Sequence, residues 1–378
     1  MSLPTSALPA KVLHVETGRH LYGGAQQVVH LISGQRARGV PSVLVCATGS
    51  DIALSLAGVA TIYEVPIRGE LDWALTRHVL RIARQERPAI VHLHSRRGAD
   101  LFGGLAARWG HWPVVLSRRV DTAESRWTSP LKYQLFDRVI AISHCIERVL
   151  LESGVPAAKV SCVHSGIDAA AFDKPADRSW LCGEFGFPQG SLVVGMIAQL
   201  IPRKGHTLLL QAIAALSAKY PRLRAVLFGQ GPLEASLRDE IAARGLEERV
   251  RLGGFRRDLN RIVPSLDLVV HPALAEGLGV ALIQSAAAAV PIIGTHAGGV
   301  PEIVRHQENG LLVPPGDASA LASAMDRLLG DEPLRKQMGE RGRDLVAREF
   351  SLDQMVAGNL AVYQELLAAQ TSTRLKAS

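Results

Sequence analysis

The sequence predicts an α/β protein built from two similar doubly wound parallel-sheet domains. Short apolar runs alternate with helix-like stretches through both halves, which is typical of parallel strands joined by crossover helices. The 378 residues exceed the size at which one hydrophobic core usually stops growing. A segment rich in charge, proline and glycine, residues 173–190, separates the two series and is interpreted as a linker. We therefore expect a first domain over residues 1–176, a second over 177–350, and a closing helix and tail over 351–378 that pack back toward the first.

The first half begins with the apolar run KVLHVETG, followed by the glycine turn YGGAQQ that opens a helix. Further strands are expected at PSVLVCATG, ATIYEVPI, AIVHLHS, WPVVLSRRVD, RVIAISHC and VSCVHSGID. Helices are expected at Ser50–Ala57, before Pro88, from Gly98 to Trp109 and from Ile146 to Ser153. The continuous apolar character of AIVHLHS predicts a central strand that is buried on both faces.

The second half repeats the pattern. Strands are expected at SLVVGMIAQL, LRAVLFG, VRLGGF, Leu266–Val270 and Val290–Gly294, and closing helices at Ala318–Leu329, Glu332–Glu349 and Leu352–Ala369. Parallel strands bring their carboxyl ends to one edge of the sheet, where the following helices begin with unpaired backbone N–H groups. We expect ligands at that edge.

The net charge of +7 implies an acidic partner, such as a nucleotide or an anionic membrane. Nucleic acid is disfavoured, because aromatic residues are only 5% and no nucleic-acid-binding motif accompanies the arginines. The basic residues gather in one part of the first half: Arg96, Arg97, Arg108, Arg118, Arg119, Arg126, Lys132, Arg138 and Arg148. This placement suits a phosphorylated or lipid-linked substrate at a membrane face, and a merely solvated basic face is the alternative.

Neither a spanning helix nor a signal peptide is expected, since no apolar run reaches about 18 residues. A cytoplasmic protein, peripheral on the inner face of the membrane, is the resulting expectation. The four cysteines, Cys46, Cys145, Cys162 and Cys182, have neither the close pairing of a zinc site nor the density of a disulfide framework. They are expected to be reduced and structural.

The stretch from His271 to Val304 is the candidate binding site. Glu276 stands at a strand-to-helix turn, where its carboxylate can accept hydrogen bonds from hydroxyls. Gly277 and Gly279 allow the backbone to approach an anion at the following helix N-terminus. Hydroxyls together with a diphosphate describe a nucleotide sugar. Arg203 and Lys204 follow the strand SLVVGMIAQL and would add cations, although a single lysine in such a loop is usually only solvated.

The order of these motifs resembles that of the family 4 glycosyltransferases, retaining enzymes with the GT-B fold of two facing Rossmann-like domains and a cleft between them. The resemblance covers nearly the whole chain, through YGGAQ, HSGID, PRKGH, FGQGP, the Glu276 region, GGVPEIV, NGLLVPPGD and the closing FS helix. Each motif alone is weak evidence for the family. The resemblance depends on their occurring together in this order and at this spacing.

The resemblance implies roles for individual residues. Glu276 would contact the donor sugar, while Lys204 and Arg203 would act on the diphosphate. The other donor-binding positions implied are Gly23, Gly24, Gln199, Gly229, Gly231, Pro232, Phe255, Arg256, Gly277, Leu278, Gly279 and Gln284. Two of these depart from the family pattern, because Gln284 replaces the second acid of its Glu-x7-Glu motif and Gln199 replaces an arginine.

A third departure lies in the first domain. Many family members carry a histidine followed by an aspartate after the fourth strand, whereas this chain has Arg119, Val120 and Asp121 there. Asp121 aligns with the aspartate, and the histidine has no counterpart. His94, Ser95, Arg96 and Arg119 are expected acceptor contacts, and His92 is more simply a core residue.

The activity implied is metal-independent, retaining transfer of a hexosyl or related group from a nucleoside-diphosphate sugar to a hydroxyl acceptor. Synthesis of cell-surface polysaccharide or lipopolysaccharide is expected, with a lipid-linked glycan as acceptor and no cofactor or metal. A dehydrogenase is disfavoured, because the first turn lacks GxGxxG and the later acid. Two alternatives stay open, a GT-B-type sugar-nucleotide epimerase and a catalytically silent sugar-nucleotide-binding or scaffold protein.

Overall fold

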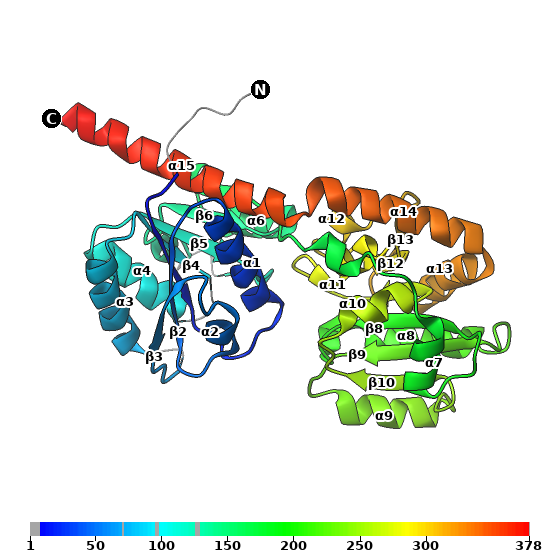
Figure 1. Cartoon of the computed structure of the whole chain (residues 1–378). Coiled ribbons are helices and arrows are strands. Elements are labelled where there is room, and N and C mark those ends of the chain that lie inside the picture. The colour runs from blue at the N-terminus through cyan, green and yellow to red at the C-terminus, as the bar shows by residue number, and fades with distance from the viewer. Residues whose placement is uncertain (1–7, 70–71, 95–97, 125–128, 378) are drawn as a thin grey trace. The chain divides into compact units, whose positions relative to one another are not determined.

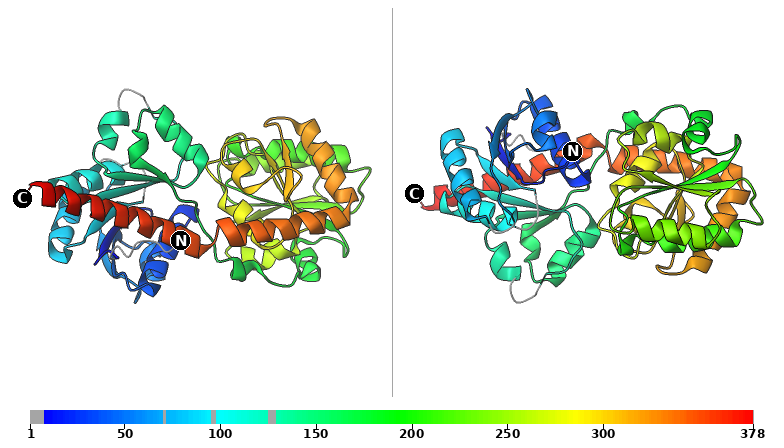
Figure 2. Two further views of the ribbon diagram at one scale, coloured as in Figure 1. Left: turned by 90° about the horizontal axis from the view of Figure 1, so that it is seen from above. Right: turned by 90° about the horizontal axis from the view of Figure 1, so that it is seen from below.

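The computed structural model describes residues 8–69, 72–94, 98–124 and 129–377 (Figure 1). The chain forms two compact units, one of Met1–Gly166 with Leu352–Ser378 and the other of Ile167–Ser351. Each unit has a parallel sheet with helices on both faces (Figure 2). The predicted α/β class with two doubly wound sheets is therefore confirmed. The chain passes between the units at Gly166 and Ile167, whereas the sequence placed this boundary after residue 176.

The first unit contains a seven-stranded sheet in the order β3-β2-β1-β4-β5-β6-β7. Its strands are β1 (Val12–Glu16), β2 (Ser42–Ala47), β3 (Thr61–Val65), β4 (Ile90–Leu93), β5 (Val114–Arg118), β6 (Arg138–Ala141) and β7 (Val160–Cys162). Its helices are α1 (Gly23–Ala37), α2 (Asp51–Ser55), α3 (Trp73–Glu86), α4 (Ala99–Trp109), α5 (Ser129–Tyr133), α6 (His144–Glu152) and α15 (Leu352–Ala377). Strands β1, β2 and β4 are buried along their whole length, which explains why they read as continuous apolar runs.

Helix α15 returns from the end of the chain to complete the first unit. Met355, Val356 and Tyr363 share a core cluster with Val12 of β1 and Leu31 of α1. The helix extends to Ala377, beyond the expected end at Ala369. The core of the first unit therefore depends on residues that are most distant from it in the sequence.

The second unit contains a six-stranded sheet in the order β10-β9-β8-β11-β12-β13. Its strands are β8 (Leu192–Ile197), β9 (Leu223–Phe228), β10 (Val250–Gly254), β11 (Leu268–His271), β12 (Ile292–Thr295) and β13 (Gly310–Val313). Its helices are α7 (Arg178–Phe185), α8 (His206–Leu216), α9 (Glu234–Ala243), α10 (Leu259–Ile262), α11 (Val280–Ala287), α12 (Val300–Ile303), α13 (Ala318–Gly330) and α14 (Glu332–Glu349). None of the helices in the described ranges is both long and apolar enough to cross a bilayer.

The segment 173–190, interpreted from its composition as a linker, contains helix α7 and belongs to the second unit. Asp177 caps this helix by accepting a hydrogen bond from the Trp180 backbone N–H at 3.1 Å. Leu181 and Cys182 are buried. The linker interpretation was wrong because charged residues, proline and glycine outnumber the few apolar residues that anchor this helix.

Candidate functional site

Each sheet has one place where the strand order reverses, between β1 and β4 in the first unit and between β8 and β11 in the second. Ligands of open parallel sheets bind outside the strand carboxyl ends at such a switch point. Lys204 and Glu276 lie on the loops that leave β8 and β11. His94 directly follows β4, and Gly24 lies in the first turn of the helix after β1.

The switch point of the second unit holds a buried cluster of Lys204, Glu276 and His271. Lys204 Nζ lies 2.5 Å from Glu276 Oε2, and His271 Nε2 lies 2.8 Å from the same oxygen. The side chains of Lys204 and Glu276 are only 8% and 11% exposed. The structure thus joins two of the predicted residues directly and adds His271, which the sequence analysis did not assign. Its position at the carboxyl end of β11 is the signal that could have found it.

Glycines hold the loops of this cluster together. A Cβ at Gly205 would lie 2.1 Å from the Pro272 carbonyl oxygen, and one at Gly298 would lie 1.9 Å from the Glu276 carbonyl oxygen. Both glycines have positive φ, 75° and 55°, which side chains disfavour. The Gly299 N–H also donates to the Glu276 carbonyl at 2.9 Å. Glycine is therefore required here for backbone contacts that fix Glu276.

The carboxyl group of Glu276 is ionised at neutral pH. Burial, the largest influence, would raise its pKa, but the His271 hydrogen bond and the charges of His271 and Lys204 together lower the pKa to about 2. His271 is accordingly the donor to Oε2, and Oε1 accepts from the Gly277 N–H at 3.2 Å. An ionised carboxylate is an acceptor only, which suits hydroxyl recognition.

His206, the first residue of α8, lies buried beside this cluster and was not predicted as a site residue. Neither ring nitrogen has a hydrogen-bond partner in the part of the chain that the structure describes. Burial, followed by the charges of His271 and Lys204, lowers its pKa to about 4. The imidazole is therefore neutral near pH 7 and adds no charge to the cluster.

The remaining predicted donor residues of the second unit are spread over neighbouring loops. A Cβ at Gly229 or Gly231 would lie 2.0 or 2.5 Å from the carbonyl oxygens of Ala198 and Leu200, so these glycines are explained by loop packing. Four of the remaining residues are exposed: Gln199, Arg203, Pro232 and Phe255, the last by 48%. Leu278 is buried, and Gly279 directly precedes α11. Gln284 is half-buried on that helix.

Arg256, predicted as a donor-binding residue, is engaged by two carboxylates. Its Nε is 2.8 Å from Asp258 Oδ1, and a terminal nitrogen is 2.5 Å from Glu184 Oε1. The hydrogen bonds to Asp258 and Glu184 raise the pKa of the guanidinium above its ordinary value. Its charge is thus compensated within the protein, and any contact with a base would be by stacking of the planar guanidinium.

The switch point of the first unit is lined by three buried imidazoles, His14 on β1 and His92 and His94 at the end of β4. His14 Nε2 is 2.9 Å from Gln35 Oε1, and its Nδ1 is 2.8 Å from His94 Nε2. His14 must donate to the amide oxygen, so its Nδ1 accepts from His94. His94 Nδ1 then carries no proton and can only accept a hydrogen bond. It is buried without a hydrogen-bond partner among the described residues.

His92 is anchored separately. Its Nδ1 is 2.5 Å from the Tyr363 hydroxyl of α15, and its Nε2 is 2.8 Å from Ser117 Oγ. The Tyr363 hydroxyl accepts from Gln35 Nε2 at 3.3 Å and can therefore donate to His92. His92 is a satisfied core residue, as its sequence position indicated.

The neutral histidines predict a loss of stability in mild acid. Burial lowers the pKa of His14 from 6.5 to about 4, and lowers those of His92 and His94 well below 6.5. Below pH 6.5 the unfolded chain therefore binds more protons than the folded chain. The contribution of the neutral histidines to the free energy of unfolding is complete above pH 6.5 and is lost as the pH falls toward 4. We expect the free energy of unfolding in urea to fall by about 2 kcal/mol for His14 alone between pH 7 and 5.

A matched pair of variants tests this expectation. His14→Gln removes one titrating group and should flatten the pH dependence, although it lowers stability at pH 7. His20→Gln changes a side chain that is 68% exposed and should leave the dependence unchanged. An equal pH dependence of wild type and His14→Gln would contradict the assignment.

The other predicted residues of the first unit lie near His94. Glu16 and Arg119 are close enough for Glu16 to raise the pKa of Arg119, although burial has the larger effect and lowers it to about 10. A Cβ at Gly24 would lie 3.6 Å from Arg119 Cδ, so the predicted glycine turn borders this arginine. Gly23 opens the same helix, and Asp121 is in the loop after β5. Ser95 and Arg96 lie outside the described residues.

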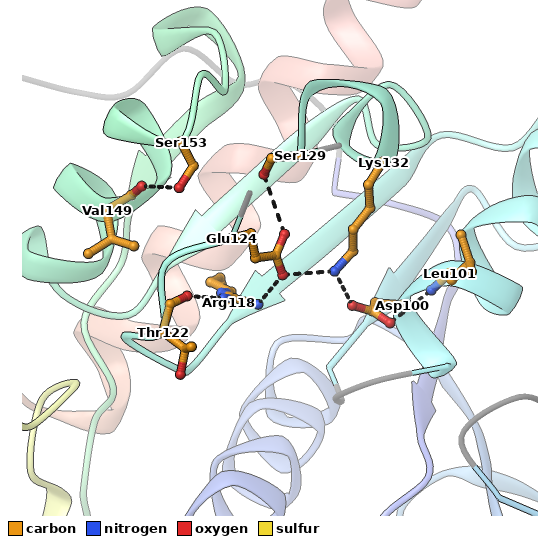
Figure 3. Close-up of polar contacts among 9 residues, drawn as sticks. All are labelled: Asp100, Leu101, Arg118, Thr122, Glu124, Ser129, Lys132, Val149 and Ser153. Carbon is orange, nitrogen blue, oxygen red and sulfur yellow. Dashed lines mark hydrogen bonds and ion pairs between the residues drawn. The ribbon is translucent and has the colours of Figure 1, made fainter. Parts of the chain in front are cut away.

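Two basic residues of the expected membrane face, Arg118 and Lys132, are neutralised internally. Lys132 Nζ is 2.6 Å from Asp100 Oδ2 and 3.0 Å from Glu124 Oε1, and Arg118 is 2.8 Å from the same Glu124 oxygen (Figure 3). Burial favours protonation of Glu124, but Lys132 and Arg118 outweigh it and lower the pKa. This chain of charges braces the loop after β5, so Arg118 and Lys132 do not contribute to a basic surface.

Comparison with known proteins agrees with this architecture. A family model described as Glycosyltransferase Family 4 matches residues 22–171, and one described as Glycosyl transferases group 1 matches residues 183–345. The chain is 27% identical over 368 residues to the lipopolysaccharide core biosynthesis glycosyltransferase LpsE of Rhizobium meliloti (strain 1021), an alignment that covers 95% of this chain and 99% of the relative.

Two solved structures show the same fold. A glycosyltransferase from Rickettsia africae ESF-5 superimposes with a TM-score of 0.84 at 20% identity, covering 94% of this chain and 98% of the other. Anabaena Alr3699/HepE in complex with UDP-glucose superimposes with a TM-score of 0.80 at 21% identity, covering 96% and 99%. With one family model on each doubly wound unit and these neighbours, the chain belongs to the family 4 glycosyltransferases and has the GT-B fold.

Proposed function

We propose that this glycosyltransferase uses a nucleoside-diphosphate sugar as donor and transfers the sugar to a hydroxyl acceptor with retention of anomeric configuration. The observation that carries the proposal is the buried cluster of Lys204, Glu276 and His271 at the switch point of the second unit. It places a cation and an ionised carboxylate where ligands of parallel sheets bind. A charged diphosphate joined to a hydroxylated sugar matches this pair.

In this mechanism Lys204 stabilises the negative charge that grows on the diphosphate as the glycosidic bond breaks. An ammonium group has three N–H donors, so Lys204 can retain Glu276 and still meet a phosphate oxygen. Its pairing with Glu276 holds the ammonium in place before the donor arrives, and such preorganised charge is effective in catalysis. Arg203 and the amides after Glu276 add to this stabilisation, and we propose that no metal ion is needed at the donor.

Glu276 recognises the sugar in the same proposal. One oxygen receives Lys204 and His271, while the other receives only the Gly277 N–H among the hydrogen bonds found at this carboxylate in the described residues. A carboxylate oxygen has room for a second donor, which a sugar hydroxyl would supply. Gln284, one helical turn into α11, would contact the ribose without charge.

We assign the acceptor to the first unit, with His94 and Arg119 as its contacts and Asp121 as a catalytic residue beside them. The bare Nδ1 of His94 supplies an acceptor for a hydroxyl hydrogen, and Arg119 supplies a cation. Since the relative from Rhizobium meliloti is named for lipopolysaccharide core biosynthesis, we propose a lipid-linked or lipopolysaccharide glycan as acceptor. Contact with an anionic membrane would then use basic residues other than Arg118 and Lys132.

A sugar-nucleotide-binding protein without transferase activity is the second candidate. It is favoured by Gln199 and Gln284, which leave two positions of the donor site without the charges that the family pattern has there. Such a protein would bind the donor without transferring its sugar. An epimerase would convert the donor when no acceptor is present, so the two alternatives are separable.

Calorimetric titration tests the donor proposal. We expect selective binding of one nucleotide among UDP, GDP, ADP and their sugars, in the presence of a chelator. Incubation of the preferred nucleotide sugar with labelled glycan acceptors then distinguishes transfer from binding alone, and product analysis by NMR gives the anomeric configuration. Failure to bind any nucleotide would overturn the donor site, and inversion at the anomeric carbon would overturn the retaining mechanism.

A further inference from the structure

Three potential metal ligands converge at the carboxyl edge of the first unit, apart from the imidazoles at its switch point. One ligand atom from each of His144, Cys162 and His164 lies within 4.8 Å of the other two. His144 is the first residue of α6, and Cys162 is the last residue of β7. Because β6 and β7 are adjacent parallel strands, they deliver these residues to the same edge.

The local backbone explains the convergence. Cys162 pairs with Ala141 at the end of β6, and the Val163 N–H donates to the Ala141 carbonyl at 2.9 Å, so the extended pairing continues past the strand. Residues two apart in an extended segment point to the same side, which places Cys162 and His164 together. His144 comes from the turn that follows β6. Its ring meets the ring of His164 edge to face, with centroids 5.3 Å apart.

His144 is already oriented as a metal ligand would be. Its Nδ1 is 2.8 Å from Glu147 Oε2, one helical turn along α6. A carboxylate that accepts from one imidazole nitrogen directs the other nitrogen toward a metal, an arrangement that is common around zinc. In such an arrangement His144 would coordinate through Nε2. The His144 side chain is 61% exposed, so an ion can enter from solvent.

We propose that His144, Cys162 and His164 bind one Zn²⁺ ion, with Glu147 orienting His144 and water at the fourth position. Two imidazoles and a thiolate are borderline to soft ligands that suit Zn²⁺ and not Mg²⁺ or Ca²⁺. Tetrahedral Zn²⁺ needs ligand atoms roughly 3.3–3.7 Å apart, so the distances within the cluster must shorten by at most about 1.5 Å. The ion would link the first turn of α6 to the end of β7.

The imidazoles of His14, His92 and His94 are the competing cluster, and they are less suited to a metal. Both nitrogens of His14 and both of His92 already have hydrogen bonds to protein groups. An ion there would have to break several buried bonds. The zinc proposal also departs from the sequence analysis, which found no metal site because its ligands lie 18 and 2 residues apart in the chain.

Metal binding can be measured without a donor or acceptor, so its outcome is independent of the proposed transfer reaction. The full chain, treated with chelator and reduced, is titrated with Zn²⁺ against a chromophoric competitor, and with Co²⁺ as a spectroscopic probe. We expect one equivalent of each ion, with tetrahedral cobalt bands and a thiolate-to-cobalt charge-transfer band. Cys162→Ser should abolish the charge-transfer band, and Glu147→Gln should weaken Zn²⁺ binding about 10–100-fold.

Cys145→Ser is the matched control, because Cys145 neighbours His144 on α6 but is not part of the cluster. It should leave affinity and spectrum unchanged. Circular dichroism of each metal-free variant verifies folding. Absence of stoichiometric binding to the wild type, retention of the charge-transfer band in Cys162→Ser, or its loss in Cys145→Ser would each overturn the proposed site.

Discussion

Replacing Lys204 by alanine is expected to lower kcat for sugar transfer by about 10²–10³-fold, the usual effect of removing one group that stabilises developing negative charge. The ammonium is buried, lies 2.5 Å from Glu276, and is placed at the switch point of the sheet. Steady-state kinetics with the preferred nucleotide sugar measure the change. Turnover near that of the wild type would remove Lys204 from the mechanism.

The same substitution leaves the carboxylate of Glu276 without its cation, which costs about 3–5 kcal/mol for a buried pair. Lost activity could then reflect unfolding. The double variant Lys204→Met with Glu276→Gln removes both charges and keeps the buried volume, so it should fold and remain inactive. Lys219→Ala is the matched control, since Lys219 is 62% exposed in its pair with Asp326 and should retain full turnover.

Replacing Glu276 by glutamine is expected to remove most transfer activity while the chain still folds. The amide keeps the size of the side chain but loses the charge that attracts Lys204 and the second acceptor lone pairs needed by a sugar hydroxyl. We expect a fall in kcat with little change in the affinity for free nucleotide, because the nucleotide lacks the sugar. Kinetics and calorimetry on one preparation measure both quantities. Retained turnover would contradict the assignment.

The acid stability of this variant supplies an independent measurement. The Glu276 pKa is about 2 in the folded protein against an ordinary 4.5, so its stabilisation is present above pH 4.5 and lost as the pH falls toward 2. Glu276→Gln should lower the free energy of unfolding at pH 7 by about 3 kcal/mol and flatten its pH dependence below 4.5. Glu234→Gln, on an exposed pair of α9, should change neither.

The fold could be predicted well because its signals are local. The alternation of apolar runs and helical stretches depends on residues within a few positions of each other. Of the thirteen strands in the described residues, it predicted all but β13. Helix α7 was missed because the segment was interpreted from its overall composition. That composition is dominated by charged residues, proline and glycine and hides the few buried residues that anchor a short helix. The local pattern also did not predict that α15 extends past Ala369 to Ala377.

The candidate site could be predicted only as a set of residues. The order of motifs singled out Lys204 and Glu276, and the structure brings them together. His271 was missed because a histidine at the end of an apolar strand looks like any core residue until its neighbours are known. His206 was missed because nothing local shows that the first residue of α8 is buried. Gly229 and Gly231 were predicted as donor-binding positions, and the structure adds that both lie against backbone carbonyls of the neighbouring loop.

The sequence by itself determined the alternation of strands and helices, the presence of two doubly wound units, and the charged residues at strand ends. Only the tertiary structure decided which of these side chains meet. Lys204 and Glu276 are 72 residues apart, and His92 and Tyr363 are 271 apart. Their pairing depends on strand order and on how α15 packs on the first sheet. Burial follows from the same packing, and burial sets the charge states of Glu276 and of the histidines.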